Sequence, residues 1–523
     1  MKQHVTVIVP PVVCHNLDPH TGIPFMPHIA AYMAGTLRDA GYQIQVIDAF
    51  GLQPNQRQVV RDFMLMGVDE EWIVAHLHPE TAMVYIYCRT IAEFIAVERL
   101  IEALRNLRPD IKIGLFENIQ AVTSYSLRPI AAEWLGKGCD VVLMGEPEDR
   151  VVEVTRAFLD DDPIDHILGI AYRARDGASV VKEETPLNET LDRLAMPAWE
   201  HFPLEGYWRA GFAHAPVKAG SRFLPLLTSR GCPYRCTFCI APSVNPKWRA
   251  RSAAVVVNEI EHFNKTMGVT DFHVSDLNPT VSEPRICAIC EEILKRDLRI
   301  TWKLAQGTKI ETIKHESTLE LMAKAGCRFI SFSPESGSSR LLAIMNKPFD
   351  HEHGVRMLKK MAEVNIRTQA VFLGGVPGEN SDDQGQSLAY AKRLIKLGLD
   401  EVSLVIFTPL PGAALAGAIK GFEHYSQCTP SPSWRLDYDE IRRYRFRMYG
   451  TYFLAKIMFQ PRKFMRSMYG LMTGQYETKM EMSLFKQLKL YGLRYLPGLF
   501  PQLDAEAVQQ AADRGNSGGI LGP

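Results

Sequence analysis

Short apolar runs alternate with helical patterns over the first third of the chain. The runs are rich in β-branched residues and lie at 5–9, 44–47, 83–87, 111–115 and 140–144. Helical spacing of apolar positions is clearest over 27–40 and 91–107. Strands that alternate with helices predict a parallel, doubly wound sheet, whose ligands bind outside the carboxyl ends of the strands. The loops at those ends are 10–27, 48–56, 88–91 and 116–125.

The same alternation returns after residue 220 with six further runs. We expect strands at 223–228, 269–274, 300–304, 329–333, 370–373 and 402–407. Helical patterns lie between them, which favours a partial (β/α)6 barrel of parallel strands. The predicted fold class is therefore α/β, with a doubly wound Rossmann-like domain, the barrel and a helical C-terminal extension.

Changes of pattern divide the chain into four segments. Asp176-Gly177 lies between two short β-branched runs and is a hairpin signal. We expect a Rossmann-like domain at 1–160, a connector at 161–220, the barrel at 221–425, and a helical extension with a flexible tail at 426–523.

Composition and charge exclude several classes of protein. The 523 residues are 46% hydrophobic, which is ordinary for a globular protein with a large core. The formal net charge is zero, so no general attraction to nucleic acid is expected. No apolar run reaches the ~18 residues of a membrane span, and we expect no signal peptide, since Met1-Lys-Gln-His leads directly into a predicted strand. Ten cysteines in a chain of this size do not resemble a disulfide scaffold, which favours a reducing cytoplasm.

Three cysteines on one short stretch carry the strongest chemical signal. Cys232, Cys236 and Cys239 follow the strand expected at 223–228 with Cys-x-x-x-Cys-x-x-Cys spacing. Soft thiolates are the preferred ligands of iron–sulfur clusters. Three of them leave one iron of a [4Fe–4S] cluster open for a substrate. A structural zinc site is the competing interpretation, but zinc sites usually bring a second ligand pair at a fixed spacing, and none follows closely.

The stretch Arg230-Gly-Cys-Pro-Tyr-Arg-Cys-Thr-Phe-Cys239 resembles the signature of radical S-adenosylmethionine (SAM) enzymes. The resemblance implies that the open iron binds the amino and carboxylate groups of SAM, and that an electron from the cluster releases a 5′-deoxyadenosyl radical. The N-terminal part is similar to the cobalamin-binding domain that precedes the radical domain in cobalamin-dependent members. That similarity lies in the segment 30–41, the strand end Val46-Ile-Asp48 and the turn Gly145-Glu-Pro-Glu148.

The same resemblance implies where SAM is held. In the family, the position after the second barrel strand contacts the amino group of SAM, and Asp276 and Asn278 stand there. A carboxylate at this place would pair with the ammonium. Further contacts are expected after the fourth and fifth barrel strands, from Glu335, Ser336, Gly374 and Gly375. One departure is Gln306-Gly-Thr308, where the family usually has an arginine.

The N-terminal domain departs from the cobalamin-binding pattern of the family. The Asp-x-His-x-x-Gly motif, which supplies a lower histidine ligand to cobalt, is absent, as it is in many radical members. Phe116 and Glu117 stand where the family usually has a Gly-Gly pair that lets the corrin tail approach the backbone. Arg89 follows the third strand and is expected to face the ligand cavity. Cobalamin is expected beside the cluster and SAM, and its loss from a retained fold stays open.

The first functional hypothesis is a cobalamin-dependent radical SAM C-methyltransferase of class B, which modifies an unactivated carbon in a biosynthetic pathway. The second keeps the radical chemistry but oxidises, hydroxylates or cyclises its substrate, as in anaerobic modification of tetrapyrroles such as bacteriochlorophyll precursors. A non-enzymatic electron-transfer protein is disfavoured by the SAM-contact motifs. A methylthiotransferase carries further N-terminal cluster cysteines, and it is disfavoured because Cys14, Cys88 and Cys139 are spaced like strand ends rather than like such a motif. No catalytic residue beyond the cluster is expected.

The same family implies the partners. We expect a small-molecule substrate, which a capped barrel would allow to be large and apolar, and an external electron donor of flavodoxin or ferredoxin type. The C-terminal stretches 442–449 and 459–466 are basic, aromatic and rich in methionine. Amphipathic helices of this kind can lie on a membrane surface. Packing on the barrel or capping of a substrate is the favoured interpretation.

Overall fold

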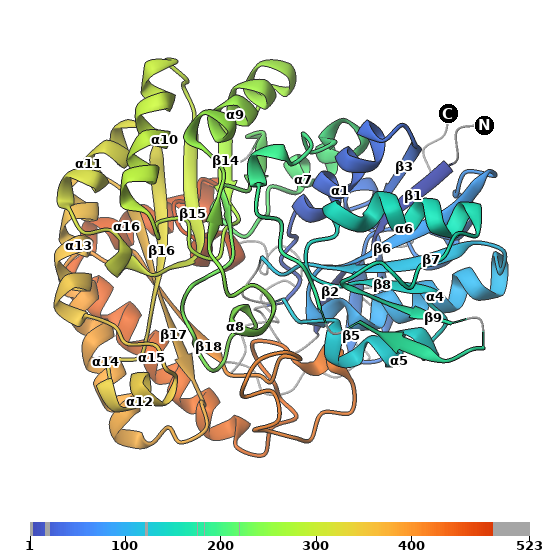
Figure 1. Ribbon diagram of the computed structural model, residues 1–523. Coiled ribbons are helices and arrows are strands. Elements are labelled where there is room, and N and C mark those ends of the chain that lie inside the picture. Colours follow the sequence, from blue (N-terminus) through green and yellow to red (C-terminus); the bar gives the residue numbers. More distant parts are fainter. Residues whose placement is uncertain are drawn as a thin grey trace.

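The computed structural model describes residues 4–15, 21–120, 124–174, 176–182, 184–218 and 220–484. Two α/β bodies lie side by side (Figure 1). The N-terminal body is blue to teal, and the second body is green to orange. The loop that contains α8 (Ala241–Val244) lies between them. The predicted α/β fold class is confirmed.

The N-terminal body is built on a seven-stranded sheet with a parallel core. Its order is β10-β9-β8-β7-β6-β1-β3. The members are β1 (His4–Val9), β3 (Gln43–Asp48), β6 (Thr81–Cys88), β7 (Lys112–Glu117), β8 (Val141–Leu143), β9 (Ile170–Arg173) and β10 (Ser179–Val181). The five parallel strands follow the order of a doubly wound sheet, whose direction switches between β1 and β6. The ends of these two strands, after Val9 and Cys88, are therefore where a ligand is expected.

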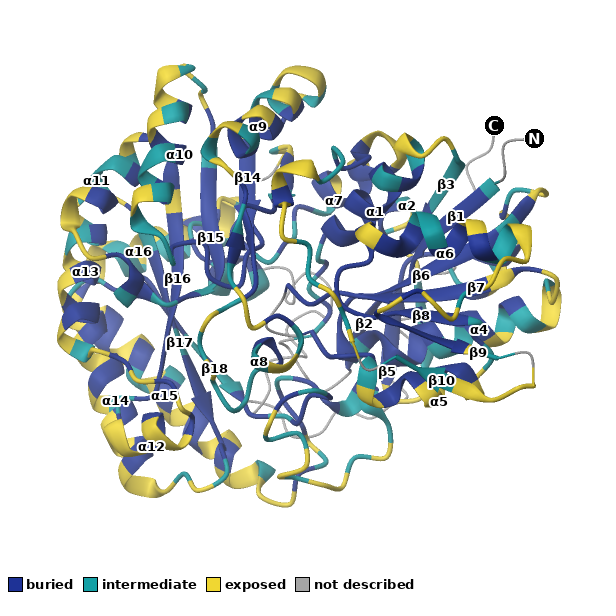
Figure 2. Cartoon of the chain, in the orientation of Figure 1, coloured by how far each residue is buried: buried dark blue, intermediate teal, exposed yellow. Residues whose placement is uncertain are grey.

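Helices cover both faces of this sheet. They are α1 (His28–Asp39), α2 (Ala49–Leu52), α3 (Glu70–Ala75), α4 (Phe94–Leu107), α5 (Ala131–Gly136) and α6 (Glu148–Asp160). In α4 the buried side chains recur at helical spacing, as Val97, Leu100, Ile101 and Leu104 show. Figure 2 shows buried strands between helices whose outer faces are exposed. Burial on both faces explains the uninterrupted apolar runs of β1 and β6.

The hairpin predicted around Asp176-Gly177 extends this sheet. β9 pairs antiparallel with both β8 and β10. The N-terminal sheet thus continues to Val181, past residue 160, where we expected the connector to begin. Beyond it, the chain forms α7 (Leu204–Ala210), which packs against α2.

A second, three-stranded antiparallel sheet is a feature that the sequence pattern did not predict. It consists of β2 (Val12–His15), β5 (Phe63–Met66) and β4 (Arg57–Val60), in that order. β2 lies inside the segment 10–27, which we expected to be a loop. Its partner β5 comes from beyond the second strand of the main sheet. Such pairing depends on tertiary packing, here of Val13 and Phe63 with Ile95, and no local pattern reveals it.

The second body is a six-stranded parallel sheet in simple chain order, β11-β14-β15-β16-β17-β18. The strands are β11 (Phe223–Leu226), β14 (Asp271–Val274), β15 (Thr301–Thr308), β16 (Cys327–Glu335), β17 (Arg367–Gly374) and β18 (Glu401–Ile406). A short hairpin, β12 (Ser229–Arg230) with β13 (Arg249–Ala250), brackets the stretch with the three cysteines. The predicted partial (β/α)6 barrel is confirmed, and its carboxyl ends form one mouth.

Helices alternate with the barrel strands. They are α9 (Ala253–Met267), α10 (Glu283–Lys295), α11 (Glu316–Lys324), α12 (Ser339–Ile344), α13 (His351–Glu363) and α14 (Ser381–Lys396). Local chemistry sets their ends. Ser252 caps α9 by accepting a hydrogen bond from Val255 N, and Gly268 ends that helix with φ of +65°. Asn380 begins α14 with a capping box to Asp383.

Two helices follow the barrel, α15 (Tyr438–Phe459) and α16 (Pro461–Thr473). α15 packs against α14 and β18. Tyr452 Oη donates to the carbonyl oxygen of Asp400 at 2.9 Å and fixes this contact. None of the described helices is long and apolar enough to cross a membrane. The flexible tail that we expected before residue 523 lies outside the described residues.

The contact between α7 and the N-terminal body depends on a glycine. A Cβ at Gly206 would stand 1.9 Å from the carbonyl oxygen of Gly51. We predict that Gly206→Ala pushes the two elements apart and lowers the melting temperature, at a cost of about 1–3 kcal/mol. Gly136 at the end of α5 has open space at its Cβ position, so Gly136→Ala is the matched control and should not lower the melting temperature. Equal melting temperatures for the two variants would contradict the close approach.

Candidate active site

The three cysteines Cys232, Cys236 and Cys239 lie on the loop between β12 and α8. All three are half-buried and free. Gly231 makes the turn into this loop, since its φ is +80° and a Cβ there would stand 2.2 Å from the carbonyl oxygen of Lys247. The backbone N–H of Cys232 donates to the carbonyl oxygen of Asn245 at 3.1 Å and closes the loop.

The barrel fixes the middle of the cysteine loop from two sides. Thr237 N donates to Met345 O at 3.0 Å, and Leu415 N donates to Thr237 O at 3.0 Å. Asn346 Nδ2 adds a hydrogen bond to Arg235 O at 2.9 Å. The thiols are therefore held against the segments that follow β16 and β18.

The chemistry of this donor set fits a [4Fe–4S] cluster. Burial raises the pKa of Cys232 and Cys236 above the ordinary value and that of Cys239 to about 12. The positive charge of Lys347 opposes the shift in all three. Ala241 N also donates to Cys239 Sγ at 3.4 Å. The loop has no fourth cysteine, so a cluster held here keeps one iron free for another ligand.

Two lysines reach the cysteine loop, and the sequence patterns did not reveal them. Lys347 Nζ forms an ion pair with Glu335 and lies 5.9 Å from the ring centre of Phe238. Lys309 Nζ lies 5.1 Å from the ring centre of Tyr234. Both aromatic residues alternate with the cysteines in the sequence, so both ammonium groups stand at the edge of the loop. A single lysine in a loop has no periodicity, so neither lysine could be predicted from the sequence.

Glu335 ends β16 in an unusual backbone conformation. Its φ is +60°, in the left-handed region that non-glycine residues avoid. Such a conformation costs about 1–3 kcal/mol and persists where the surroundings impose it. The side chain is buried against the Lys347 ammonium. The strained strand end thus directs a carboxylate toward the cysteine loop.

Asp276 is buried at the end of β14, but protein groups occupy its carboxylate. Oδ1 accepts from Thr228 N at 2.7 Å, and Oδ2 accepts from Thr228 Oγ1 and Ser229 Oγ, each at 2.5 Å. These three bonds fasten the entrance of the cysteine loop to β14. Asn278, two residues later, keeps a buried Nδ2 that has no partner in the described part of the chain.

Ser336 is also engaged with protein. Its Oγ lies 2.9 Å from Ser387 Oγ and accepts from Ser338 N at 3.0 Å. The hydroxyl therefore holds the turn between β16 and α12 against α14.

Gly374 and Gly375 face the C-terminal extension. A Cβ on Gly374 would meet the Tyr444 ring of α15 at 3.2 Å. Gly375 has φ of +71°, and its carbonyl oxygen accepts from Arg435 Nη2 at 2.9 Å. Both glycines admit the extension to the barrel mouth, at positions where we expected a close approach of SAM.

A cavity lies between the carboxyl edge of the N-terminal sheet and the barrel. The N-terminal body contributes Tyr87, Arg89 and Asn118, and the barrel contributes His273, Ser275 and Gln306. Arg89, which we expected to face a ligand cavity, is in this lining and forms a buried ion pair with Glu93 at 2.5 Å. The two bodies therefore share one cavity at the ends of their strands.

Several buried polar atoms in and near this cavity have no partner among the described residues. They are Tyr87 Oη, His28 Nε2, Gln306 Oε1 and both side-chain polar atoms of Gln120. Burial lowers the pKa of His28 to about 3, so its imidazole is neutral. Buried polar groups without partners are costly, and they mark places where a polar ligand restores the hydrogen bonds. The amide side chains of a corrin ring offer such bonds, so these residues fit cobalamin.

Phe116 and Glu117, the last two residues of β7, do not lie in the cavity lining. Phe116 stacks on Tyr87 with ring centres 4.9 Å apart. The Glu117 carboxylate accepts from Leu127 N at 2.5 Å and from Gly145 N. We expected both side chains to crowd a corrin tail. Glu117 instead holds the turn that leads into α6.

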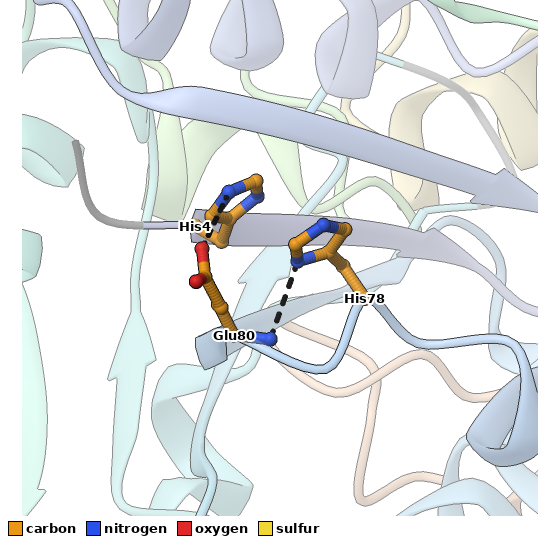
Figure 3. Close-up of side chains that lie close together, drawn as sticks. All are labelled: His4, His78 and Glu80. Atoms are coloured by element: carbon orange, nitrogen blue, oxygen red, sulfur yellow. Dashed lines mark hydrogen bonds and ion pairs between the residues drawn. The ribbon is translucent and has the colours of Figure 1, made fainter. Parts of the chain in front are cut away.

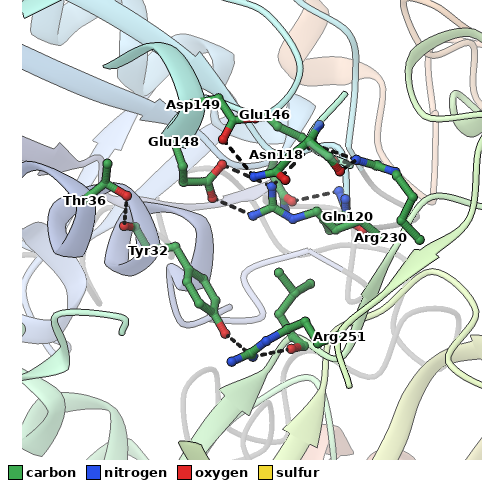
Figure 4. A network of polar contacts seen from close by, with 12 residues as sticks. Tyr32, Thr36, Asn118, Gln120, Glu146, Glu148, Asp149, Arg230 and Arg251 are labelled. Atoms are coloured by element: carbon green, nitrogen blue, oxygen red, sulfur yellow. Dashed lines mark hydrogen bonds and ion pairs between the residues drawn. The ribbon is translucent and has the colours of Figure 1, made fainter. Parts of the chain in front are cut away.

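A buried network of charges joins the N-terminal body to the cysteine loop (Figure 4). Arg230, two residues before Cys232, lies with Nη2 2.5 Å from Glu148 Oε1 and with Nη1 3.1 Å from Glu148 Oε2. Arg249 Nη2 lies 2.6 Å from Glu146 Oε1. The Arg230 and Glu148 side chains are only 1% and 3% exposed. The turn before α6 therefore holds both ends of the cysteine loop.

A third arginine extends this network to α1. Arg251 Nη1 lies 2.8 Å from Glu259 Oε2 and donates to Tyr32 Oη at 3.0 Å. Tyr32 Oη in turn donates to Glu259 at 2.9 Å. Arg251, directly after the hairpin β12–β13, thereby joins α1 of the N-terminal body to α9 of the barrel.

Comparison with known proteins identifies the domain around this loop. Residues 226–391 match the radical SAM superfamily. The chain carries a radical SAM domain. The match begins in β11 and ends in α14, so it includes the three cysteines, Asp276 and Glu335. A [4Fe–4S] cluster and SAM are the cofactors that a radical SAM domain implies.

Relatives of this radical SAM enzyme include a methyltransferase and a cyclase. The cytidylyl-2-hydroxyethylphosphonate methyltransferase of Streptomyces wedmorensis is 26% identical over 424 residues, which cover 73% of this chain and 76% of the relative. The anaerobic magnesium-protoporphyrin IX monomethyl ester cyclase of Rubrivivax gelatinosus is 26% identical over 450 residues, which cover 83% of this chain and 75% of the relative.

A solved structure shares the arrangement of both bodies. The radical SAM methyltransferase TsrM of Kitasatospora setae, with cobalamin and a [4Fe-4S] cluster bound, aligns with a TM-score of 0.62 at 18% identity. The alignment covers 80% of this chain and 77% of TsrM. At this identity the likeness shows the fold, in which a further domain accompanies the radical SAM domain.

A second group of potential metal ligands lies away from the radical SAM domain (Figure 3). The group consists of His4, His78 and Glu80, and their potential ligand atoms all lie within 4.8 Å of one another. Within the described residues, no other set of three or more His, Cys, Asp or Glu side chains meets this criterion. The two imidazoles stack at 3.8 Å. Since His4 begins β1, the group lies at the amino ends of the strands. It is thus remote from the cavity at their carboxyl ends.

The ion pair of Arg230 with Glu148 generates a prediction. Removal of one partner from a buried pair leaves an uncompensated charge and costs about 3–5 kcal/mol. We predict that Arg230→Met lowers both the melting temperature and the iron bound after anaerobic reconstitution. Replacement of both partners, in Arg230→Met with Glu148→Leu, should restore much of the melting temperature because no charge is left unpaired. If the double variant melts no higher than Arg230→Met alone, the ion pair of Arg230 with Glu148 does not contribute to stability.

Glu117 generates a prediction for pH. Burial raises the pKa of this carboxyl from 4.5 to about 7. The folded chain therefore favours the protonated form, so the contribution of Glu117 to stability is full below pH 4.5 and is lost as the pH rises through 7. We predict that Glu117→Gln, which cannot ionise, gains melting temperature relative to wild type between about pH 5 and about pH 8. A difference that stays constant over this range would show an ordinary pKa.

Proposed function

We propose that this radical SAM enzyme is a cobalamin-dependent C-methyltransferase that acts on an unactivated carbon of a small molecule. The observation that carries the proposal is the cavity shared by the two bodies. Its walls come from the strand ends of the N-terminal sheet and from the strand ends of the barrel beside the cysteine loop. A methyl donor held by the first body would meet a substrate radical formed in the second. The fold of TsrM, which is a methyltransferase with cobalamin bound, supports this arrangement.

Cys232, Cys236 and Cys239 would hold the cluster. When bound, the cluster supplies the electron that cleaves SAM to a 5′-deoxyadenosyl radical, which takes hydrogen from the substrate. The chain's own part is to fix the loop, and the bonds of Asp276 to Thr228 and Ser229 do this. These bonds support a role for Asp276 in positioning the loop.

We propose that SAM is bound by charged side chains and by hydrogen-bond donors at the barrel mouth. Glu335 and Lys347 form a buried pair of opposite charges beside the loop. Such a pair matches the ammonium and carboxylate of the methionine part of SAM. Asn278 Nδ2 adds a buried donor that has no partner among the described residues. Ser336, Gly374 and Gly375 shape the mouth through their contacts with α14 and the extension.

The cavity walls suit chemistry that water would quench. Phe25, Tyr87 and Phe223 bring aromatic rings to the lining. Burial lowers the pKa of His28 and His214, so both imidazoles stay neutral. A site of this kind holds a substrate in line with its reaction partners and excludes solvent.

An oxidising or cyclising reaction is the second candidate. Phe116 and Glu117 replace the small residues expected near a corrin tail, and Phe116 stacks on Tyr87 of the cavity wall. The match to the magnesium-protoporphyrin ester cyclase, over 83% of this chain, also favours it. In this case the radical chemistry is retained and no methyl group is transferred.

We further propose an electron donor of flavodoxin or ferredoxin type and a reducing cytoplasm. The three cysteines of the loop form no disulfide bond. The half-buried cysteine loop leaves a short path from a docked carrier to a cluster at this place.

Anaerobic reconstitution tests the proposal. The full chain is loaded with iron, sulfide and hydroxocobalamin, desalted, and examined by absorbance for bound corrin. We predict stoichiometric corrin and, with SAM and a reductant, release of 5′-deoxyadenosine. Cys236→Ser should abolish 5′-deoxyadenosine, because the cluster loses one of its three ligands. Cys327→Ser, at a buried cysteine of β16 outside the loop, is the matched control and should retain it.

The outcome separates the two candidates. Cluster and 5′-deoxyadenosine with bound corrin, and a product that gains a methyl group by mass spectrometry, support methyl transfer. Cluster and 5′-deoxyadenosine without corrin support oxidation or cyclisation. Absence of 5′-deoxyadenosine from a cluster-loaded sample would contradict both.

A further inference from the structure

The exposed apolar surface of this protein is concentrated on the C-terminal extension. Among the described residues, fourteen large apolar side chains are exposed. Leu107, Leu168, Leu294 and Ile344 are scattered over the rest of the chain, and the other ten lie between 436 and 472. Single exposed apolar residues are ordinary on a protein surface, whereas a cluster of them marks a place of interaction.

The exposed apolar side chains of α15 lie on one side of that helix. On α15, Ile441, Tyr444, Met448 and Tyr452 are buried on the side that packs against α14 and β18. Phe446, Phe453, Leu454, Ile457 and Met458 follow the same helical spacing on the opposite side and are exposed.

α16 continues the pattern. Met465, Tyr469 and Met472 recur at steps of four and three residues and are 66%, 63% and 85% exposed. We define the outer face by the exposed apolar residues of α15 and α16. Packing on the barrel, which we favoured from the sequence, accounts only for the opposite side of α15.

Beyond the first turn of α15, which contains Asp439 and Glu440, the charge of this segment is entirely positive. Residues 441–476 contain no Asp or Glu and eight basic residues, which are Arg442, Arg443, Arg445, Arg447, Lys456, Arg462, Lys463 and Arg466. The whole chain has a net charge of zero, so the segment is a strong local excess. Arg443 and Arg462 are exposed and form no ion pair in the described part of the chain. The surface of an anionic bilayer has a layer of phosphates outside the acyl chains. Unpaired arginines match the phosphates, and the apolar side chains beside them match the acyl chains.

We propose that the outer face of α15 and α16 binds the surface of a membrane that contains anionic lipid. The exposed leucine, phenylalanine and methionine side chains enter the boundary of the acyl chains, and the arginines meet the phosphates. The helices lie on the bilayer and do not cross it, in agreement with the absence of a spanning helix among the described residues. Pairing with a second copy of the same face would bring two sets of unpaired arginines together, and their repulsion disfavours that occupant. This inference is independent of the proposed reaction.

Vesicle sedimentation tests the inference with the full chain, prepared anaerobically. We predict that the protein sediments with vesicles of phosphatidylcholine and phosphatidylglycerol, and about tenfold or more weakly with phosphatidylcholine alone. High salt should release it, because the attraction of the arginines to the phosphates is screened. Equal binding to both kinds of vesicle, or binding to neither, would overturn the proposal.

Two variants test the face itself. Leu454→Glu with Met458→Glu places charge at positions that are 68% and 69% exposed, and it should reduce binding at least about tenfold without a change in melting temperature. Leu107→Glu with Leu294→Glu is the matched control, at exposed apolar positions outside the face, and should bind as wild type does. Equal loss in both variants would contradict the assignment. Light scattering that shows a dimer in wild type and a monomer only in the Leu454→Glu, Met458→Glu variant would assign the face to a second copy instead.

Discussion

The structure depends on a pair of buried charges between its two bodies. Arg230 precedes the first cysteine of the loop, and its guanidinium lies against Glu148 at the start of α6. Arg249, at the other end of the loop, meets Glu146 in the same turn. These side chains are nearly inaccessible to water, so each charge needs its partner where it stands. The place of the cysteine loop is therefore set by the N-terminal body as well as by the barrel.

These ion pairs bring the strand ends of the two bodies together at one site. A doubly wound sheet and a parallel barrel each expose the carboxyl ends of their strands, and the network turns those ends toward each other. Asp276 fastens the loop to β14, and Glu117 fastens β7 to Gly145 in the turn before α6. The cavity with Tyr87 on one wall and Gln306 on the other follows from these ties. The strand ends of both bodies therefore line the same cavity.

The fold could be predicted well from the sequence, because apolar runs and helical spacing are local signals. In a fold built on parallel sheets these signals recur with every strand and helix. The sequence predicted the cysteine loop for the same reason, since ligand spacing is local. It missed the sheet β2-β5-β4, Lys309 and Lys347, because each depends on contacts between distant segments. Its assignment of Asp276 to SAM stays a prediction, and the structure adds that this carboxylate accepts hydrogen bonds from Thr228 and Ser229. Whether a polar residue at a strand end binds a ligand or a neighbouring hydroxyl is decided by tertiary structure, which spacing does not contain.

Hydrogen exchange of the cysteine loop is the most direct measurement of the central claim. The amides of 230–245 would be compared between wild type and Glu148→Leu by mass spectrometry, with the remote hairpin β9–β10 as internal reference. The account predicts exchange at least about tenfold faster in the loop of the variant and unchanged exchange in the hairpin, because the arginine that holds the loop has lost its partner. Unchanged protection of the loop would contradict the claim that the N-terminal body holds it in place.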